Sequence, residues 1–315
     1  MSENLPATDA VIPVLRRFNR TYTQRIGVLD DSYLGTGRPL NVSRVLFEIA
    51  PAQPVTVQRL RQRLGLDSGY LSRLLARLEA DGLIRIEPDP ADRRRRIVTT
   101  TAAGRRAAAD LEDRSETRAR QLVATLTERQ RVRLARALGE AELLVRAATV
   151  EFEEVPSDDP AARAAQQTYF DELAARFPQG FTPTAGPAIE LPVREIVAVS
   201  EGAPVACGAV RRLDARTAEV KHLWAHPGWR GSGLGSRMLH RLEQLAAEDG
   251  AGRIVLDTNG TLTEAIGLYR HAGYVEIPRY NDNPYAELFF EKRLDVEPVN
   301  PEASPSPEAG TSPDR

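Results

Sequence analysis

The chain has 315 residues, which exceeds a typical single domain and predicts two domains. Its hydrophobic content of 42% and charged content of 27% are ordinary for a globular protein, and no apolar run approaches the roughly 18 residues that cross a membrane. The N-terminal residues lack a signal-peptide pattern, and the single cysteine, Cys207, excludes an internal disulfide. We therefore expect a cytoplasmic protein with no membrane partner.

The formal net charge of −2 conceals an asymmetry between the two halves of the chain. Residues 1–150 contain 26 arginines, no lysine and 18 acidic residues, which gives a formal charge of +8. Residues 151–315 contain 16 basic and 26 acidic residues, which gives −10. A basic half joined to an acidic half suggests that only the first half meets a polyanion.

The first half reads as mainly helical. Apolar spacing predicts helices over about residues 10–26, 42–50, 56–64 and 68–81, with Gly65 as a left-handed cap between the last two. Two helices joined by a short glycine turn, the second with a polar N-terminal end, form a helix-turn-helix layout. The strands LIRIE and IVTTT follow, and a turn with four consecutive arginines separates them. Such a cationic β-hairpin suits a phosphate backbone or a narrow minor groove, so DNA binding is favoured over a merely solvated charge run.

Residues 1–147 resemble the MarR family of winged helix-turn-helix regulators. The family's wing pattern, D-x-R followed by L-T-x-x-G, is matched by Asp92, Arg94, Thr101 and Gly104, with Thr100 in place of the usual leucine. The resemblance implies double-stranded DNA as a partner, a wing shaped by the Asp–Arg pair, and an arginine that enters the minor groove. The DNA-binding candidates are Ser68, Tyr70, Ser72, Arg73 and Arg77 on the second helix, and Asp92, Arg93, Arg94 and Arg95 in the wing.

Two further long helices are predicted from Ala102 to about Val145. They are separated near Thr127, where the pattern T-x-x-Q is similar to a capping box. These helices do not belong to the winged core, so they need a partner. In the MarR family they build a two-fold dimer together with the first helix, and the resemblance therefore implies a homodimer.

The second half reads as α+β. A possible first strand over residues 149–155 precedes a helix over 161–177 and three successive strands over 194–200, 203–213 and 217–227. A helix over Leu234–Glu248, a strand over 253–259, a short helix over 262–273 and strands over 274–278 and 285–294 follow. An antiparallel meander followed by β-loop-α-β differs from the βαβαβ order of a dinucleotide-binding fold.

A glycine-rich stretch, HPGWRGSGLGSRML, joins the third strand to the following helix. Glycines just before a helix let backbone N–H groups approach an anion, and the helix dipole favours a phosphate there. The alternative is a tight turn with no ligand. The spacing G-x-G-x-G matches neither the dinucleotide fingerprint nor a P-loop.

Residues 148–294 resemble the GNAT superfamily of acetyl-CoA-dependent N-acetyltransferases, a mixed and mostly antiparallel sheet with flanking helices. The superfamily's loop pattern [QR]-x-x-G-x-[GA] is met by Arg230, Gly233 and Gly235, and the Ala265-to-Tyr269 step keeps the usual spacing. The resemblance implies acetyl-CoA as co-substrate, with its pyrophosphate on the loop and its pantetheine along the preceding strand. The cofactor-binding candidates are Leu223, Trp224, Ala225, Arg230, Gly231, Ser232, Gly233, Leu234, Gly235, Asn259 and Tyr269.

Two residues are candidates for catalysis. Acetyl transfer requires a free amine, and Glu219 resembles the position where many family members carry the general base. Tyr269 would donate its hydroxyl to the leaving thiolate. The alternatives are a glutamate paired with an arginine on a strand face and a tyrosine that only packs.

The acceptor site is the least specified part. The connection PRYNDNPYAEL offers Arg279, Tyr280, Asn281 and Tyr285, and Arg279 could hold an acceptor carboxylate or only stabilise its own turn. His222 and His226 are four residues apart, but no carboxylate or cysteine cluster joins them, so no metal site is expected. The Pro/Ser/Glu-rich residues 295–315 are expected to be disordered.

The sequence therefore predicts a DNA-binding transcriptional regulator that is also an N-acetyltransferase for a small-molecule or protein amine. The alternative is a transcription factor whose GNAT-like domain binds acetyl-CoA or an amine without transferring acetyl. Either way, the winged domain could also have lost DNA binding and serve only as a dimer module.

Overall fold

A computed structural model describes residues 8–28, 30–183 and 193–294 of the chain. The chain divides into two compact units, Met1–Glu142 and Leu143–Arg315, here called the N-terminal and C-terminal units. Each unit has its own sheet and its own hydrophobic core, which confirms a mainly helical winged unit followed by an α+β unit. The tail from Asp295 lies outside the described residues. Within the described ranges, no helix is long and apolar enough to cross a membrane.

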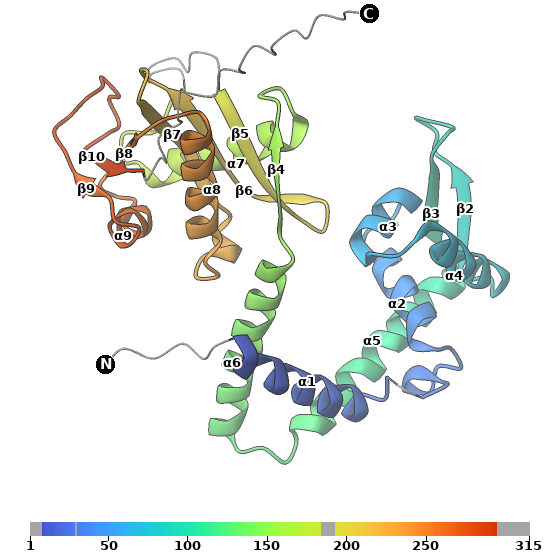
Figure 1. Ribbon diagram of the computed structural model, residues 1–315. Helices are drawn as coiled ribbons and strands as arrows, with labels where there is room; N and C mark the ends of the chain where they lie inside the picture. Colours follow the sequence, from blue (N-terminus) through green and yellow to red (C-terminus); the bar gives the residue numbers. More distant parts are fainter. Residues whose placement is uncertain (1–7, 29, 184–192, 295–315) are drawn as a thin grey trace, which may run out of the picture. The chain divides into compact units, whose positions relative to one another are not determined.

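The N-terminal unit consists of helices and a small three-stranded sheet (Figure 1). Its elements are α1 (Thr8–Arg25), the 3-10 turn η1 (Tyr33–Gly35), α2 (Leu40–Ile49), β1 (Val55–Thr56), α3 (Val57–Leu64), α4 (Ser68–Ala80), β2 (Ile84–Pro88), β3 (Arg96–Thr100), α5 (Ala102–Val123) and α6 (Glu128–Ala148), which continues into the other unit.

Local hydrogen bonds at helix ends explain the helix-turn-helix. Thr56 Oγ1 accepts from the backbone N–H of Arg59 at 3.2 Å and begins α3. Gly65 ends α3 with φ 62°, a left-handed conformation that glycine adopts without steric cost. Asp67 Oδ1 then accepts from the N–H of Tyr70 at 2.8 Å and begins α4. The buried apolar face of α4 consists of Leu71, Leu74, Leu75 and Leu78.

The wing is the antiparallel hairpin of β2 and β3, and β1 pairs with the other edge of β3. The strand β1 was not predicted, because two residues are too few for a pattern. Thr101 fixes the end of the wing: its hydroxyl donates to Gly82 O at 2.7 Å and accepts from Gly104 N at 3.0 Å. A Cβ on Gly104 would lie 1.9 Å from Leu83 O, so only glycine fits at this position. The T-x-x-G part of the wing pattern thus has a steric cause.

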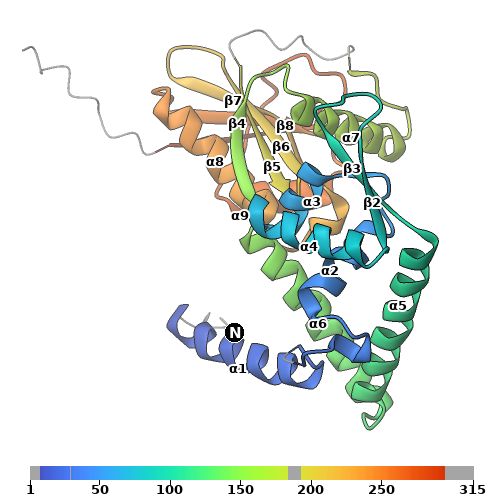
Figure 2. The ribbon, with the colours of Figure 1, turned by 90° about the vertical axis from the view of Figure 1, so that its right-hand side faces the viewer.

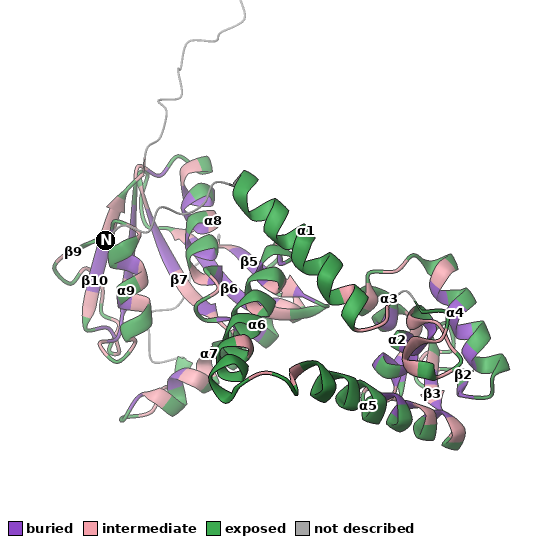
Figure 3. Cartoon of the chain, turned by 90° about the horizontal axis from the view of Figure 1, so that it is seen from below, coloured by how far each residue is buried: buried purple, intermediate pink, exposed green. Residues whose placement is uncertain are grey.

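The long helices of the N-terminal unit are well formed and largely exposed. Thr127 Oγ1 accepts from Gln130 N at 3.3 Å and Gln130 Oε1 accepts from Thr127 N at 2.9 Å, which confirms the predicted capping box. Figure 3 shows α1 exposed along most of its length. The large apolar side chains of α1 that are 42–55% exposed are Val11, Ile12, Val14, Leu15, Phe18 and Tyr22.

The C-terminal unit contains one seven-stranded sheet in the order β4-β5-β6-β7-β8-β10-β9. All neighbouring strands are antiparallel except β7 and β8, which are parallel. Its elements are β4 (Glu151–Val155), α7 (Pro160–Arg176), β5 (Val193–Ser200), β6 (Ala203–Arg212), β7 (Thr217–Ala225), the 3-10 turn η3 (Pro227–Trp229), α8 (Leu234–Glu248), β8 (Arg253–Thr258), α9 (Thr263–His271), β9 (Val275–Glu276) and β10 (Leu288–Arg293).

Helices cover both faces of this sheet, and Figure 2 shows α7 and α8 on opposite sides. The alternation of side chains along β6 explains the arrangement. Cys207 packs with Ala165 of α7, whereas Ala206 and Val210 belong to the core that includes Met238 of α8. The two sides of the central strands are therefore both apolar, as expected for a strand buried on both faces.

Candidate active site

The parallel strands β7 and β8 separate halfway along their length. Their pairing begins at Thr217 with Arg253 and ends at Glu219 with Val255, although both strands continue beyond that point. Strand β7 also contains a bulge, because two of its residues, His222 and Leu223, lie opposite the single residue Gly208 of β6. His222 has φ 54°, an uncommon conformation for a residue other than glycine. Bulges re-aim side chains and are frequent beside functional sites.

Two cavities lie along this separation, both within the C-terminal unit. One is lined by the glycine loop and the end of β7, and we call it the glycine-loop cavity. The other is lined by α7, the middle of β7, the end of β8 and Tyr285, and we call it the aromatic cavity. The residues that line both cavities are Tyr169, Leu173, Leu223, Leu262, Ala265 and Tyr269. The two cavities are therefore adjacent to each other.

The glycine-loop cavity has the backbone geometry of an anion site. Gly233 is the N-cap of α8 with φ 80°, and Gly231 has φ 83°, so both adopt conformations that favour glycine. The first N–H groups of α8 have no acceptor within the helix, and the helix dipole adds positive potential at the same end. Trp229, only 4% exposed, anchors the loop, because its carbonyl oxygen accepts from the hydroxyl of Ser232 at 2.7 Å.

Charged side chains at the glycine-loop cavity are paired with one another. Glu172 of α7 accepts from Arg230, from Arg176 at 3.1 Å and from the indole of Trp224 at 2.9 Å. Burial raises the pKa of the Glu172 carboxyl, but these donors outweigh it and leave the pKa below its usual value. Arg176 also lies 2.9 Å from Glu264, and this hydrogen bond is the main reason that the pKa of Glu264 falls to about 2.

Tyr269 lies where the two cavities meet. It is 5% exposed and packs with Tyr274 and Phe290 in the main core of the unit. Burial is the main cause that raises the pKa of its hydroxyl above the ordinary tyrosine value. The hydroxyl therefore keeps its proton near neutral pH and is available as a donor.

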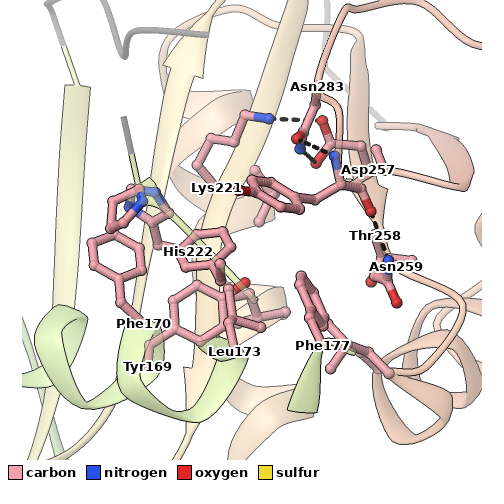
Figure 4. A pocket seen from close by; sticks show the side chains of 18 of the residues that line it. Tyr169, Phe170, Leu173, Phe177, Lys221, His222, Asp257, Thr258, Asn259 and Asn283 are labelled. Carbon is pink, nitrogen blue, oxygen red and sulfur yellow. Dashed lines mark hydrogen bonds and ion pairs between the residues drawn. The ribbon is translucent and has the colours of Figure 1, made fainter. Parts of the chain in front are cut away.

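Aromatic rings form one side of the aromatic cavity (Figure 4). Phe170 and Phe181 have ring centroids 5.5 Å apart, and Phe181 lies 5.0 Å from Tyr285. Phe177 packs edge-on against Phe181 at 6.0 Å. His222 continues this wall, with its ring 5.2 Å from Phe170 in an edge-on arrangement. These rings come from α7, the segment that follows it, the β7 bulge and the segment before β10.

The opposite side of the aromatic cavity is polar, and Figure 4 shows Lys221, Asp257 and Asn283 joined there. Lys221 Nζ lies 2.9 Å from Asp257 Oδ2 and 3.0 Å from Glu219 Oε1, so one cation meets two carboxylates. Asn283 donates to Asp257 Oδ1 at 3.3 Å. The charged side chains on this side of the cavity are therefore paired with one another.

Glu219, the predicted general base, lies at the last paired position of β7 and is completely buried. Its carboxylate accepts from Arg211 at 2.6 Å, from Lys221 at 3.0 Å and from the hydroxyl of Tyr280 at 2.8 Å. It lines neither cavity. This placement favours the alternative interpretation, a carboxylate paired with arginine, although the residue is buried and not on a solvated face.

The predicted acceptor residues separate into two groups. Tyr285 lines the aromatic cavity, whereas Arg279, Tyr280 and Asn281 do not. Arg279 donates to the carbonyl oxygens of Asn283 and Ala286 at 3.3 and 2.9 Å and therefore stabilises its own loop. Tyr280 and Asn281 donate to Glu219 behind the cavity.

The predicted cofactor residues mostly come together around the glycine-loop cavity. Those that line it are Leu223, Trp224, Ala225, Arg230, Gly231, Gly233, Leu234, Gly235 and Tyr269. Ser232 is not among its lining residues. Asn259 lines the aromatic cavity, and its amide is occupied within the protein: Nδ2 donates to Tyr285 O at 2.8 Å and Oδ1 accepts from Thr261 N at 2.9 Å.

The sequence interpretation missed the aromatic residues of α7 and of the segment after it. Tyr169, Phe170, Phe177 and Phe181 all line the aromatic cavity. The available signal was their density, because these four aromatic residues fall within 13 positions of a chain that is 6% aromatic overall. Aromatic residues on a helix usually indicate core, and nothing in the sequence placed this helix beside β7.

The predicted DNA-contacting residues form an exposed helix end and an exposed wing tip. Ser68, Ser72, Arg73 and Arg77 are exposed on α4, whereas Tyr70 is half-buried and its hydroxyl accepts from Asn41 at 2.5 Å. In the wing, the Asp92 carboxylate pairs with Arg95 at 3.2 Å and accepts from the backbone N–H of Arg94 at 3.1 Å. Thus Asp92 shapes the turn through the backbone of Arg94 and not through its side chain.

Comparisons with known proteins agree with this division. Residues 157–274 match the model of the acetyltransferase (GNAT) family, and residues 36–95 match that of the MarR family. The IAA acetyltransferase of Azospirillum brasilense is 33% identical over 106 residues, which cover 32% of this chain and 69% of the relative. The chain belongs to the GNAT acetyltransferase family. Its C-terminal unit is an N-acetyltransferase domain, and its N-terminal unit contains a MarR-family winged helix-turn-helix.

Solved structures similar to this GNAT protein match one part of the chain each. A GNAT acetyltransferase from Staphylococcus aureus is 15% identical with a TM-score of 0.40, and the match covers 46% of this chain and 99% of that one. A MarR-family transcriptional regulator from Rhodococcus is 22% identical with a TM-score of 0.34, and the match covers 43% of this chain and 96% of that one.

Proposed function

We propose that the protein is a DNA-binding transcriptional regulator that also transfers acetyl from acetyl-CoA to an amine. The observation that carries the enzymatic half is the meeting of two cavities at Leu223 and Tyr269, one of which is lined by a glycine loop. The glycine-loop cavity would hold the donor and the aromatic cavity the acceptor. In this arrangement, the thioester of the donor and the amine of the acceptor would lie next to each other.

The donor would be held mainly by backbone groups. The N–H groups of Gly231, Gly233 and Gly235 and the α8 dipole suit a pyrophosphate. Those of Ser232 and Leu234 donate within the loop at 3.3 Å. The end of β7, at residues 223–225, lines the same cavity and offers backbone groups to the pantetheine amides. Bound acetyl-CoA supplies an activated acyl group as a thioester.

Tyr269 is the proposed donor of a proton to the departing thiolate. Its hydroxyl is protonated at neutral pH, as an ordinary tyrosine is, and the residue lines both cavities. Glu219 is proposed as a positioning residue: it holds Arg211, Lys221 and Tyr280 behind the acceptor cavity.

The enzymatic half is tested by titrating acetyl-CoA into the full chain in a calorimeter and then following release of free CoA with a panel of amines. We expect saturable acetyl-CoA binding and amine-dependent CoA release, with the acetylated product identified by mass spectrometry. Binding without release for any amine would leave a ligand-sensing domain and would contradict the proposed activity.

The DNA-binding half rests on the exposed wing tip. Arg93 and Arg94 are exposed, and their side chains make no hydrogen bond or ion pair with any residue that the structure describes. Unpaired arginines on a hairpin suit phosphates or a narrow minor groove. The recognition helix α4 presents Ser68, Ser72 and Arg73 beside its exposed N-terminal end.

Salt dependence of duplex binding tests this half with a matched pair of variants. Arg94→Ala should weaken duplex binding, because one phosphate contact is lost. A plot of the logarithm of the binding constant against the logarithm of the salt concentration should become less steep by about 1. Arg163→Ala removes an arginine of α7 in the acetyltransferase domain that is also exposed, and it should change neither quantity. An unchanged slope in Arg94→Ala would contradict a wing contact.

A homodimer is proposed from the exposed apolar face of α1. Val14, Leu15 and Phe18 are 46–55% exposed, which is unusual for large apolar side chains on one helix. Sedimentation equilibrium should give twice the mass of 34.7 kDa, and Val14→Asp with Phe18→Asp should lower it toward the monomer. A monomeric wild-type chain at micromolar concentration would contradict the dimer.

A further inference from the structure

We propose that the acceptor is a primary amine whose remaining body is flat, apolar and uncharged, such as an aryl-ethylamine, and not an amino acid or a polyamine. The inference rests on the proposed function, because it assigns the aromatic cavity to the acceptor. It names a substrate class that neither the glycine loop nor the family pattern specifies.

The apolar side of the cavity is a continuous set of rings. The rings of Phe170, Phe177, Phe181 and Tyr285 all line the cavity and lie in a chain of contacts with centroid distances of 5.0–6.0 Å. Offset and edge-on arrangements of this kind leave ring faces and edges free to pack a further ring. A flat aromatic body fits this wall better than a flexible polar chain does.

The charged side chains that the structure describes in the cavity are already paired, so none remains to balance a charge on the acceptor. Lys221 is held by both Asp257 and Glu219, and Asp257 also accepts from Asn281 at 2.5 Å and from Asn283 at 3.3 Å. Arg279, the residue expected to hold a carboxylate, is turned into its own loop. A carboxylate or a second ammonium would therefore be buried without a partner among the described lining residues, which is costly.

The pKa of His222 shows how this cavity affects a positively charged group. Burial is the main cause that lowers the pKa of its imidazole to about 4, and the nearby charge of Lys221 adds to the effect. Burial, the larger of these effects, also acts on an ammonium that enters the same cavity. The cavity therefore favours the neutral amine, which is the form that attacks a thioester.

The aromatic cavity is small. Its volume is about 120 Å³. A space of this size suits a compact acceptor body, such as a single ring with a short arm, better than a long or branched chain.

The transfer balances without any additional reagent. The ammonium first loses one proton to solvent. The nitrogen then bonds to the thioester carbonyl carbon and the C–S bond breaks. The second proton leaves the nitrogen, and the thiolate takes up one proton from Tyr269, which is restored from the nitrogen or from solvent. The products are the N-acetyl amine, CoA with a free thiol and one released proton.

Two matched pairs of acceptors test the inference with the full chain at saturating acetyl-CoA. 2-Phenylethylamine and phenylalanine differ only by a carboxylate, and pentylamine and 1,5-diaminopentane differ by a second ammonium. We expect kcat/KM for CoA release to be at least about tenfold higher for 2-phenylethylamine than for phenylalanine and for 1,5-diaminopentane. Pentylamine should fall between 2-phenylethylamine and the diamine.

A pair of variants links this preference to the cavity. Phe170→Leu should lower kcat/KM for 2-phenylethylamine by about three- to tenfold, because one ring contact is lost. Phe152→Leu changes a partly buried ring of β4 that lines neither cavity and should leave the value unchanged. Equal effects of both variants would assign the change to general stability and would overturn the assignment of the cavity.

The failure of this inference is distinguishable from that of the proposed function. If acetyl-CoA binds and phenylalanine or 1,5-diaminopentane is acetylated as well as 2-phenylethylamine, the acceptor class is wrong and the enzymatic function stands. If acetyl-CoA does not bind and no amine releases CoA, the proposed function fails and the inference fails with it.

Discussion

The two cavities of the acetyltransferase domain are built in different ways. The glycine-loop cavity depends on the backbone of a contiguous stretch, in which glycine conformations and a helix N-terminus create the site. The aromatic cavity depends on side chains from α7, β7, β8 and the segment before β10, which lie far apart in the sequence. A site made of backbone is marked by its local pattern, whereas a site made of distant side chains is not. The sequence therefore predicts the site of the acetyl donor better than it predicts the site of the amine acceptor.

The largest expected effect comes from closing the backbone site. Gly233→Val places a β-branched residue at φ 80° and should displace the N–H groups that begin α8, so affinity for acetyl-CoA should fall about 100-fold or more in calorimetry. Gly250 has φ 83° at the other end of α8 and lines neither cavity. Gly250→Val should carry a similar conformational cost with unchanged affinity. Comparable losses in both variants would contradict a specific role for the loop.

The next effect concerns the residue shared by both cavities. Tyr269→Phe should lower kcat by roughly tenfold to a hundredfold, because the leaving thiolate loses its proton donor, with little change in either KM. Tyr274→Phe removes the hydroxyl of a similarly buried tyrosine that lines neither cavity and should keep kcat. A wild-type kcat in Tyr269→Phe would show that the hydroxyl of Tyr269 does not donate a proton during acetyl transfer.

A smaller catalytic effect is expected at Glu219. Glu219→Gln keeps the shape but removes the charge that balances Arg211 and Lys221, so we expect the free energy of unfolding to fall by about 3 kcal/mol. Steady-state kinetics should show kcat within about threefold of wild type. A general base would instead cost at least about a hundredfold, so that result would restore the interpretation from the sequence.

The last effect is a pH dependence of stability, with no change in catalysis expected at neutral pH. The folded chain holds His222 neutral down to a pKa of about 4, whereas an unfolded histidine takes up a proton near pH 6.5. The unfolded state therefore binds more protons between these values, and stability is lost as the pH falls from about 6.5 to 4. Denaturant midpoints of His222→Gln should fall less over this interval, whereas those of His271→Gln, a change at an exposed histidine, should follow the wild type.

Particular residues show how far the sequence could predict this protein. Thr56, Gly65 and Thr127 act through neighbours within four positions, so the sequence predicted their caps correctly. The helix Leu234–Glu248 was likewise predicted at its observed bounds. The acceptor cavity was missed because Phe170 and His222 meet only through the packing of α7 on β7, which no local pattern encodes. The sequence left two roles open for Arg279, a substrate contact and a contact within its own loop. An exposed arginine in a loop can point in several directions, and only tertiary contacts decide among them.

The separate use of the two cavities is tested most directly by initial rates of CoA release while both acetyl-CoA and 2-phenylethylamine are varied. The wild type, Gly233→Val and Phe170→Leu would be compared. We predict that Gly233→Val raises KM for acetyl-CoA alone and that Phe170→Leu raises KM for the amine alone. The account would be contradicted if each variant raised both constants equally, or if the wild type released no CoA in the presence of this amine.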